Sequence, residues 1–502
     1  MYTFSSKLKT FSFVLMIVGI LGIGYGFLTA PKDIHEVEAI LKAEAESHHG
    51  GGHAAAPAHE AKAEPTTHEA HAEAATAATS EAHAEPTAHD SVAPATEAHA
   101  AAPIAQTQKA ETAAHDTHDA NASAGHDDHK AHAEHLLHQL QNKPWAALYV
   151  ACLFFMLIAL GALAFYAIQQ VAQAGWSPVL FRVMQGITAY LLPGSIIFFI
   201  LLLLSGFHFN HLFVWMADGV TDPKSANYDH LIAGKAGYLN FPFWIIRAAV
   251  FIFGWNLYRY LSRKNCLAQD EATDNSFYKK NFKMSAAFLV FFIVTESIMS
   301  WDWIMSVDPH WFSTLFGWYV FASFFVSGIT TISMVTLYLK SKGYLENVNS
   351  SHIHDLSKFM FGISVFWTYL WFSQFMLIWY SNIPEEVTYF KTRIEDFNLP
   401  FFGAVAMNFI FPFLVLINTD FKRISWIIVM AGIVILFGHY VDFFNMIMPA
   451  TVGDQWFIGI PEISSILFFF GLFIFVVFSA LTKAPLVPKR NPFIEESKHF
   501  HY

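Results

Sequence analysis

Ten stretches of mostly apolar residues run along the chain, each long enough to cross a lipid bilayer as a helix of about 20 residues. The pattern predicts an all-α integral membrane protein. Its expected transmembrane helices cover residues 11–28, 145–172, 184–205, 239–261, 285–304, 314–339, 357–380, 399–419, 424–443 and 463–482. The composition agrees, because 54% of the 502 residues are hydrophobic and 17% are aromatic.

The first apolar stretch resembles a signal peptide in position only. It lacks a small-x-small cleavage site, and Pro31 follows Ala30 directly, so we expect a retained anchor. The chain is predicted to begin with a transmembrane anchor (residues 1–28) and a disordered linker (29–144). Two four-helix bundles follow (145–305 and 306–446), then an outer loop with the final transmembrane helix (447–482) and a cytoplasmic tail (483–502).

Residues 29–144 are rich in Ala, Glu, His, Thr and Pro and have almost no aromatic residues. Such a segment buries too little apolar surface to offset the entropy of ordering, so we predict disorder, turning helical over 127–142. It carries sixteen histidines between His48 and His138. Loose binding of Zn, Cu or Ni through His126, His129 and His132 is one interpretation. A soluble spacer without a metal site is the favoured one.

The basic residues indicate the orientation of the helices. With ten spans, every cluster of Lys and Arg falls on one side, and the short loops 305–313 and 444–462 contain none. Both termini are therefore expected on the cytoplasmic side of a cytoplasmic membrane, and the 29–144 linker on the outer, periplasmic side.

Two similar segments suggest an internal duplication. Residues 239–243 (Leu-Asn-Phe-Pro-Phe) open the fourth span, and residues 397–401 (Phe-Asn-Leu-Pro-Phe) open the eighth. Asn before a helix and Pro in its first turn are helix-start signals. We expect spans 2–5 and 6–9 to form two parallel-repeat four-helix bundles, with spans 1 and 10 peripheral. Chance similarity between Phe-rich helices is the alternative.

Four ionisable residues lie inside the spans at a similar depth, near the outer side: Arg247, Glu296, His439 and Asp442. A charge in hydrocarbon costs about 2.5–3.5 kcal/mol on insertion scales, so such residues often mark a proton path or a binding site. Arg247 and Glu296 are expected to form an ion pair, as part of a site or as a structural salt bridge. His439 and Asp442 are three residues apart, hence on one helix face, which suits a proton relay.

The outer ends of the third and fifth spans hold the candidates for quinol binding. They are His208, Asp302, Trp301 and Trp303. A quinone ring needs an apolar, aromatic slot with a hydrogen-bonding group at each carbonyl. Most interfacial tryptophans only anchor a protein at the membrane surface, which is the alternative interpretation.

The sequence contains two cysteines and lacks the motifs for c-type haem, iron–sulfur clusters, nucleotide triphosphates and dinucleotides. We therefore expect no covalently bound cofactor. Quinol or menaquinol is the expected ligand and membrane lipid the expected surroundings. No nucleic-acid partner is expected.

Residues 300–311 (SWDWIMSVDPHW) and 371–386 (WFSQFMLIWYSNIPEE) resemble the ActF subunit of alternative complex III, a bacterial quinol:cytochrome c oxidoreductase. The resemblance covers roughly residues 145–490 and extends, more distantly, to the NrfD/polysulfide-reductase membrane subunits. It implies a subunit without redox cofactors in the bacterial inner membrane, beside a related NrfD-like subunit and periplasmic iron–sulfur and c-type haem subunits. In that family the sister subunit is the better-supported quinol site. The His-rich linker is not part of the family pattern.

Two other functions remain open from the residues alone. An ion-coupled secondary transporter would use the same charged layer, although helices interrupted at the bilayer centre are not evident. A purely structural anchor for periplasmic redox subunits would use the charges for helix packing.

Overall fold

The computed structural model describes residues 2–39, 42 and 120–501. Within this part of the chain, ten helical segments are long and apolar enough to cross a membrane, and no residue is in a strand. The expected all-α membrane protein with ten spans is confirmed.

The helices of the spans are long and mostly continuous. They are α1 (Ser6–Thr29), α3 (Ala120–Val171), α5 (Leu191–Gly206), α7 (Phe241–Gln269), α8 (Ser276–Trp303), α9 (Phe316–Ser341), α10 (Ser350–Ser381), α12 (Asn398–Val405) with α13 (Phe411–Leu416), α14 (Ser425–Val452) and α15 (Ile460–Leu481). The shorter helices are α4 (Phe181–Ile187), α6 (His230–Lys235), α11 (Pro384–Glu395) and α16 (Ile494–Lys498). Single turns are η1 (Pro178–Leu180), η2 (Thr188–Tyr190), η3 (Val214–Met216), η4 (Met305–Val307) and η6 (Phe421–Arg423), and η5 (Ala406–Ile410) is π-helical.

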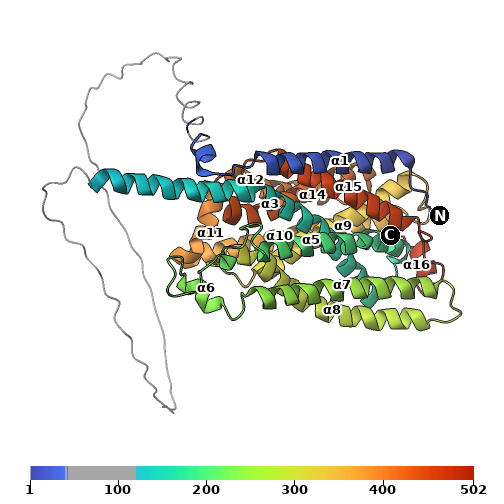
Figure 1. The fold of residues 1–502 in the computed structure, drawn as a ribbon. Helices are drawn as coiled ribbons and strands as arrows, with labels where there is room; N and C mark the ends of the chain where they lie inside the picture. The colour runs from blue at the N-terminus through green and yellow to red at the C-terminus, as the bar shows by residue number, and fades with distance from the viewer. Residues whose placement is uncertain (1, 40–41, 43–119, 502) are drawn as a thin grey trace, which may run out of the picture. The chain divides into compact units, whose positions relative to one another are not determined.

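Many contacts between the spans lie within the two predicted groups of four, but α8 of the first group also packs along α9 of the second. In bundle one, α7 packs along α5 and α8, and Tyr149 of α3 donates a hydrogen bond to the Trp303 carbonyl of α8, at 2.8 Å. In bundle two, α9 contacts α10 and α14, and α12 contacts α14. Helices α1 and α15 run side by side (Figure 1). The two separate bundles and the duplication therefore stay predictions.

Helices α3 and α9 join the two bundles at a crossing made by glycines. A Cβ atom on Gly328 would lie 2.6 Å from the backbone nitrogen of Ala162, and one on Gly161 would lie 2.5 Å from the carbonyl oxygen of Phe324. Small residues let helix backbones approach closely, which is a common basis of helix packing in membranes. The two most buried spans are therefore held in direct backbone contact.

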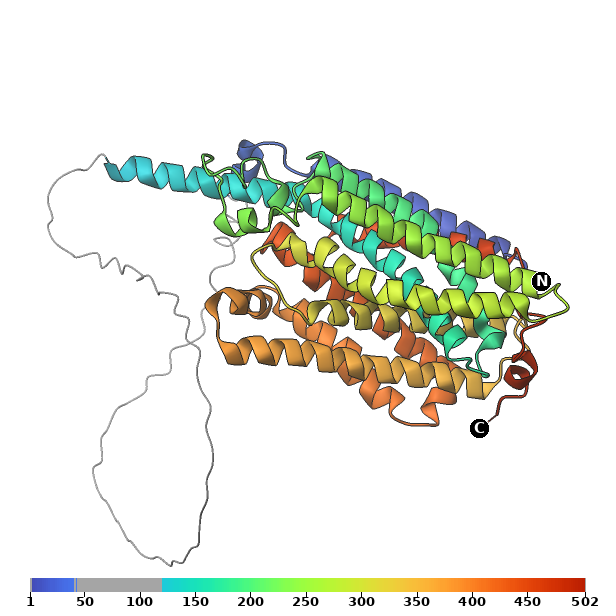
Figure 2. The same ribbon diagram turned by 90° about the horizontal axis from the view of Figure 1, so that it is seen from below.

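One end of the bundle carries α11 and is called the α11 end here (Figure 2). The helices that begin or end there include α7 at Phe241, α9 at Phe316 and α14 at Val452. The chain termini lie at the opposite end (Figure 1). All the candidate site residues discussed below lie in or near the half of the bundle toward the α11 end.

Several helix boundaries differ from the prediction, two of them near the candidate site and the linker. Helix α3 already begins at Ala120, so residues 120–144 are not disordered, and the expected helix over 127–142 is confirmed. Alanine and leucine favour this helix, and Leu136 is buried. Helix α14 continues to Val452, beyond the predicted end of the ninth span at residue 443, and Pro449 falls in its last turn. Residues 40–41 and 43–119, and the side chains of His126, His129 and His132, lie outside what the structure describes.

Candidate functional site

Arg247 forms an ion pair, but its partner is Asp302 rather than the expected Glu296. The guanidinium Nε and Nη2 donate to the two carboxylate oxygens, at 2.7 and 2.9 Å. Asp302 is fully buried, and its backbone carbonyl accepts from the Trp244 indole at 2.8 Å. The rings of Tyr238 and Phe243 lie against the guanidinium carbon at 4.0 and 4.2 Å. Both charges are compensated, as expected of a structural salt bridge between α7 and α8.

Glu296 lies apart from this pair. Its side chain is 2% exposed and accepts one hydrogen bond, from Ser297 at 2.7 Å. Its other carboxylate oxygen is buried and has no hydrogen-bond partner among the described residues. The predicted pair with Arg247 is wrong because similar depth does not place two side chains on facing sides of their helices.

The four residues predicted to bind quinol do not converge on one slot. Asp302 is occupied by Arg247, and Trp303 is fully buried in a cluster of aromatic rings with Phe198 and Trp255. Trp301 is partly buried on the same helix. His208 is exposed and has a left-handed backbone (φ 61°), and it lines a separate pocket of about 580 Å³ together with His138 and His211.

His439 and Asp442 lie together in bundle two, as their spacing predicted. The His439 Nδ1 atom is 3.8 Å from the Asp442 Oδ2 atom, and both side chains are at most 2% exposed. Ser323 of α9 links them, because its hydroxyl donates to Asp442 at 2.8 Å and lies 2.9 Å from His439 Nδ1. Tyr319 also donates to this carboxylate, and so does the Trp367 indole, at 2.9 Å. We call these five residues the Asp442 cluster.

The charge of Asp442 is balanced by hydrogen bonds rather than by a basic residue. Among the described residues, no Lys or Arg lies within 4.0 Å of its carboxylate. The three donors come from α9 and α10, two helices that pack against each other. The Nε2 atom of His439 is buried and has no partner in the same described part. A buried acid joined to a tyrosine, a serine and a histidine can exchange protons along hydrogen bonds.

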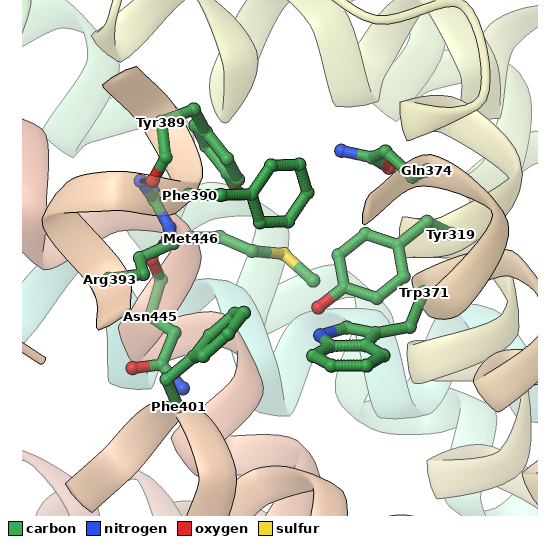
Figure 3. A pocket seen from close by; sticks show the side chains of 9 residues that line it. All are labelled: Tyr319, Trp371, Gln374, Tyr389, Phe390, Arg393, Phe401, Asn445 and Met446. Atoms are coloured by element: carbon green, nitrogen blue, oxygen red, sulfur yellow. Dashed lines mark hydrogen bonds between the residues drawn. The ribbon is translucent and has the colours of Figure 1, made fainter. Parts of the chain in front are cut away.

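A pocket adjoins the Asp442 cluster at the α11 end (Figure 3). Four helices and α11 contribute side chains to it. They are Tyr319, Trp371, Gln374, Tyr389, Phe390, Arg393, Phe401, Asn445 and Met446. Figure 3 shows aromatic rings on both sides, with the Met446 side chain between them. Tyr319 belongs to both the pocket and the cluster, so the pocket lies at one end of the hydrogen-bonded chain.

Arg393 is the main feature of this pocket that the sequence analysis missed. It lies on α11 and is 3% exposed. It donates to the carbonyls of Asn445 and Tyr389, at 3.0 and 2.8 Å, and its guanidinium carbon is 3.3 Å from the Tyr389 ring centroid. Burial lowers the pKa of Arg393 from its ordinary value. An amphipathic segment with Tyr389, Phe390 and Arg393 on one side was the available signal.

A loop contact at the α11 end is predicted to depend on pH. His310 lies 2.6 Å from the carboxylate of Asp229, which also caps α6. The hydrogen bond from His310, then those from the α6 backbone, hold the pKa of Asp229 below its ordinary value. The contact is therefore fully stabilising above the pKa of an unfolded aspartate, and this contribution is lost as the pH falls through the lower folded pKa. Thermal midpoints of wild type and Asp229→Asn should converge only as the pH falls below about 4, the pKa of an unfolded aspartate. A constant difference would contradict the prediction.

Neither a protein-family model nor a curated protein matches this chain. Within the described residues, no group of three or more His, Cys, Asp or Glu side chains could hold a metal ion.

Proposed function

We propose that the chain is an integral membrane subunit of a respiratory quinol-oxidising complex of the alternative complex III type, in which it conducts protons. The observation that carries this proposal is the Asp442 cluster. A buried carboxylate without a basic partner is expensive in a membrane, so a site that keeps one is a candidate for proton transfer. The resemblance of residues 300–311 and 371–386 to ActF supports the assignment to this complex.

In this proposal the α11 end faces the periplasm, and both termini face the cytoplasm of a bacterial inner membrane. The sequence supports it through the clusters of Lys and Arg at the other end of the spans. The partners would be a related NrfD-like subunit and periplasmic iron–sulfur and c-type haem subunits. Electrons from quinol would pass through those partners, and this chain would contribute the proton path.

The proposed role of each candidate residue depends on whether an oppositely charged residue lies beside it. Asp442 and His439 carry the proton in this proposal, and Glu296, a second carboxylate without a basic partner, remains a further candidate. Arg247 and Asp302 neutralise each other and hold α7 to α8. Direct quinol contact by His208, Trp301, Trp303 and Asp302 loses support, because these residues do not line one pocket.

Purification of the tagged full-length chain in a mild detergent tests the assignment. We expect iron–sulfur and c-type haem subunits to co-purify, identified by mass spectrometry and by a haem absorption spectrum. A structural anchor would also retain these partners, but replacing Asp442 would then leave proton transfer unchanged. A chain that purifies alone and without colour would contradict the proposal.

One observation favours a second function, an ion-coupled transporter. The eighth span is interrupted by the π-helical segment η5, which was not evident as a broken helix from the sequence. Asn408 within it is fully buried, its amide atoms have no partner among the described residues, and it packs against Gly438 beside His439. Such segments often occur at functional sites. Solute uptake driven by a proton gradient in liposomes that contain only this chain would favour the transporter.

A further inference from the structure

Arg259 on α7 carries a positive charge that no residue of the described chain neutralises. Its side chain is partly buried, and its guanidinium has no hydrogen bond or ion pair with any described residue. The Nε atom is enclosed by the protein. Buried donors normally have a partner, and a charge removed from water is costly unless it is paired. The surroundings of Arg259 therefore indicate an anionic ligand.

Two further arginines add positive charge around Arg259. Arg263 lies one turn further along α7, and the charges of Arg182 and Arg259 repel it. Arg182 is paired with Asp270, at 2.6 Å. Arg263 donates to one backbone carbonyl of α4 and one of α15, at 3.3 and 3.2 Å, and has no carboxylate within 4.0 Å among the described residues. Three arginines thus share one carboxylate, and the surplus of positive charge favours an anion.

Neighbouring residues of α7 show which way Arg259 faces. Asn256 donates a hydrogen bond to Ser195 of α5, at 3.0 Å, and Arg263 reaches α4. These two residues lie one turn before and one turn after Arg259, on the same helix face. Arg259 is therefore directed toward the junction of α4 and α5. Apolar side chains nearby are exposed on both helices, namely Leu192 and Ile196 on α5, and Phe253 and Leu257 on α7.

The depth of Arg259 matches the boundary between the hydrocarbon and the lipid head groups. The residue lies about 27 Å along α7 from Phe241, where this helix begins at the α11 end. The hydrocarbon core of a bilayer is about 30 Å thick, so the guanidinium can reach the phosphates at the opposite end. A single arginine at this depth often contacts only water. Here three guanidiniums lie near one another, which is unfavourable unless an anion lies among them.

We propose that Arg259 binds the phosphate of one anionic phospholipid, in the leaflet at the end opposite the α11 end, and that the charge of Arg263 strengthens this binding. A guanidinium and a phosphate form two parallel hydrogen bonds, and basic sites between membrane helices bind such head groups. The acyl chains would lie along the exposed apolar side chains of α5 and α7. The inference goes beyond the proposed function and does not depend on it.

Native mass spectrometry of the full-length chain tests this site, with phosphatidylglycerol and phosphatidylcholine supplied in equal amounts in a mild detergent. The wild type should retain one phosphatidylglycerol in preference to phosphatidylcholine. Arg259→Gln should weaken the binding of phosphatidylglycerol about tenfold, because the charged hydrogen bonds to the phosphate are lost. Lys264→Gln is the matched control, since it removes the same charge from an exposed residue of α7. Its binding should stay at the wild-type level.

Thermal midpoints supply a second measurement. Because Arg259 has no partner among the described residues, Arg259→Gln should unfold at the wild-type temperature in detergent without phospholipid. Added phosphatidylglycerol should then raise the midpoint of the wild type more than that of the variant. A lower midpoint of Arg259→Gln without lipid would show a structural role and overturn the site. Equal retention of phosphatidylglycerol by wild type and Arg259→Gln, or equal retention of both lipids by the wild type, would also overturn it.

Discussion

Asp442→Asn is expected to slow proton flux through the reconstituted chain by about 100-fold or more. The amide has nearly the shape of the carboxylate and can still accept hydrogen bonds from Tyr319 and Trp367, so the fold should survive. It cannot take up a proton at neutral pH, and the chain from His439 to Tyr319 is then broken. In the intact complex, quinol oxidation should lose its coupled proton release to a similar extent.

Two serines of α9 provide a matched control for this result. Ser323 bridges Asp442 and His439, whereas the Ser327 hydroxyl, one turn away, donates to the carbonyl of Ser323 and to no other described residue. Ser323→Ala should slow the flux and Ser327→Ala should not. The proton path through this cluster is refuted if Asp442→Asn conducts at the wild-type rate with normal thermal stability.

The chain holds buried charged residues in two different ways. Arg247 and Asp302 form a bidentate pair, so the two charges neutralise each other, whereas Glu296 on the same helix as Asp302 has no basic partner among the described residues. In bundle two, Asp442 and Arg393 are both buried, and neither has an oppositely charged Lys, Arg, Asp or Glu within 4.0 Å in the described chain. The presence or absence of an oppositely charged partner therefore distinguishes residues that fix helix packing from residues that can change protonation. Depth in the membrane alone does not distinguish them.

The sequence predicted the ten spans because crossing a bilayer requires an apolar length that can be counted along the chain. It also predicted the contact between His439 and Asp442, since residues three apart on one helix are neighbours whatever surrounds them. The start of α7 was predicted as well, where Asn240 caps the helix. The similar Asn398 does not cap: it is the first residue of α12 and bonds back to Ile394.

The partner of Arg247 could not be predicted from depth. Glu296 and Asp302 are six residues apart, which is about 9 Å along a helix and roughly 240° around it. The rotation of α8 about its axis decides which carboxylate faces α7, and that rotation follows from packing across the bundle. The same holds for Trp303, whose ring is buried in bundle one rather than at the membrane surface.

Arg393 was missed for a different reason. Residues 384–395 are too polar to span a membrane and appeared as a loop between two spans. In the structure they form α11, whose buried side includes Tyr389, Phe390 and Arg393. A basic residue one helical turn after a tyrosine can lie on the same helix face, but only the tertiary structure shows that this face covers the pocket.

Arg247→Met is expected to destabilise the chain by about 3–5 kcal/mol, the usual result of leaving a buried charge without its partner. Asp302 is fully buried, so its carboxylate would remain in apolar surroundings with only weaker donors nearby. The double variant Arg247→Met with Asp302→Leu should recover most of the loss, because it removes both charges. Unfolding in detergent with increasing denaturant measures these differences.

Glu296→Gln is the matched control and should change the stability by less than about 1 kcal/mol, since Glu296 has no basic partner. Equal losses in Arg247→Met and Glu296→Gln would instead restore the pair that the sequence suggested.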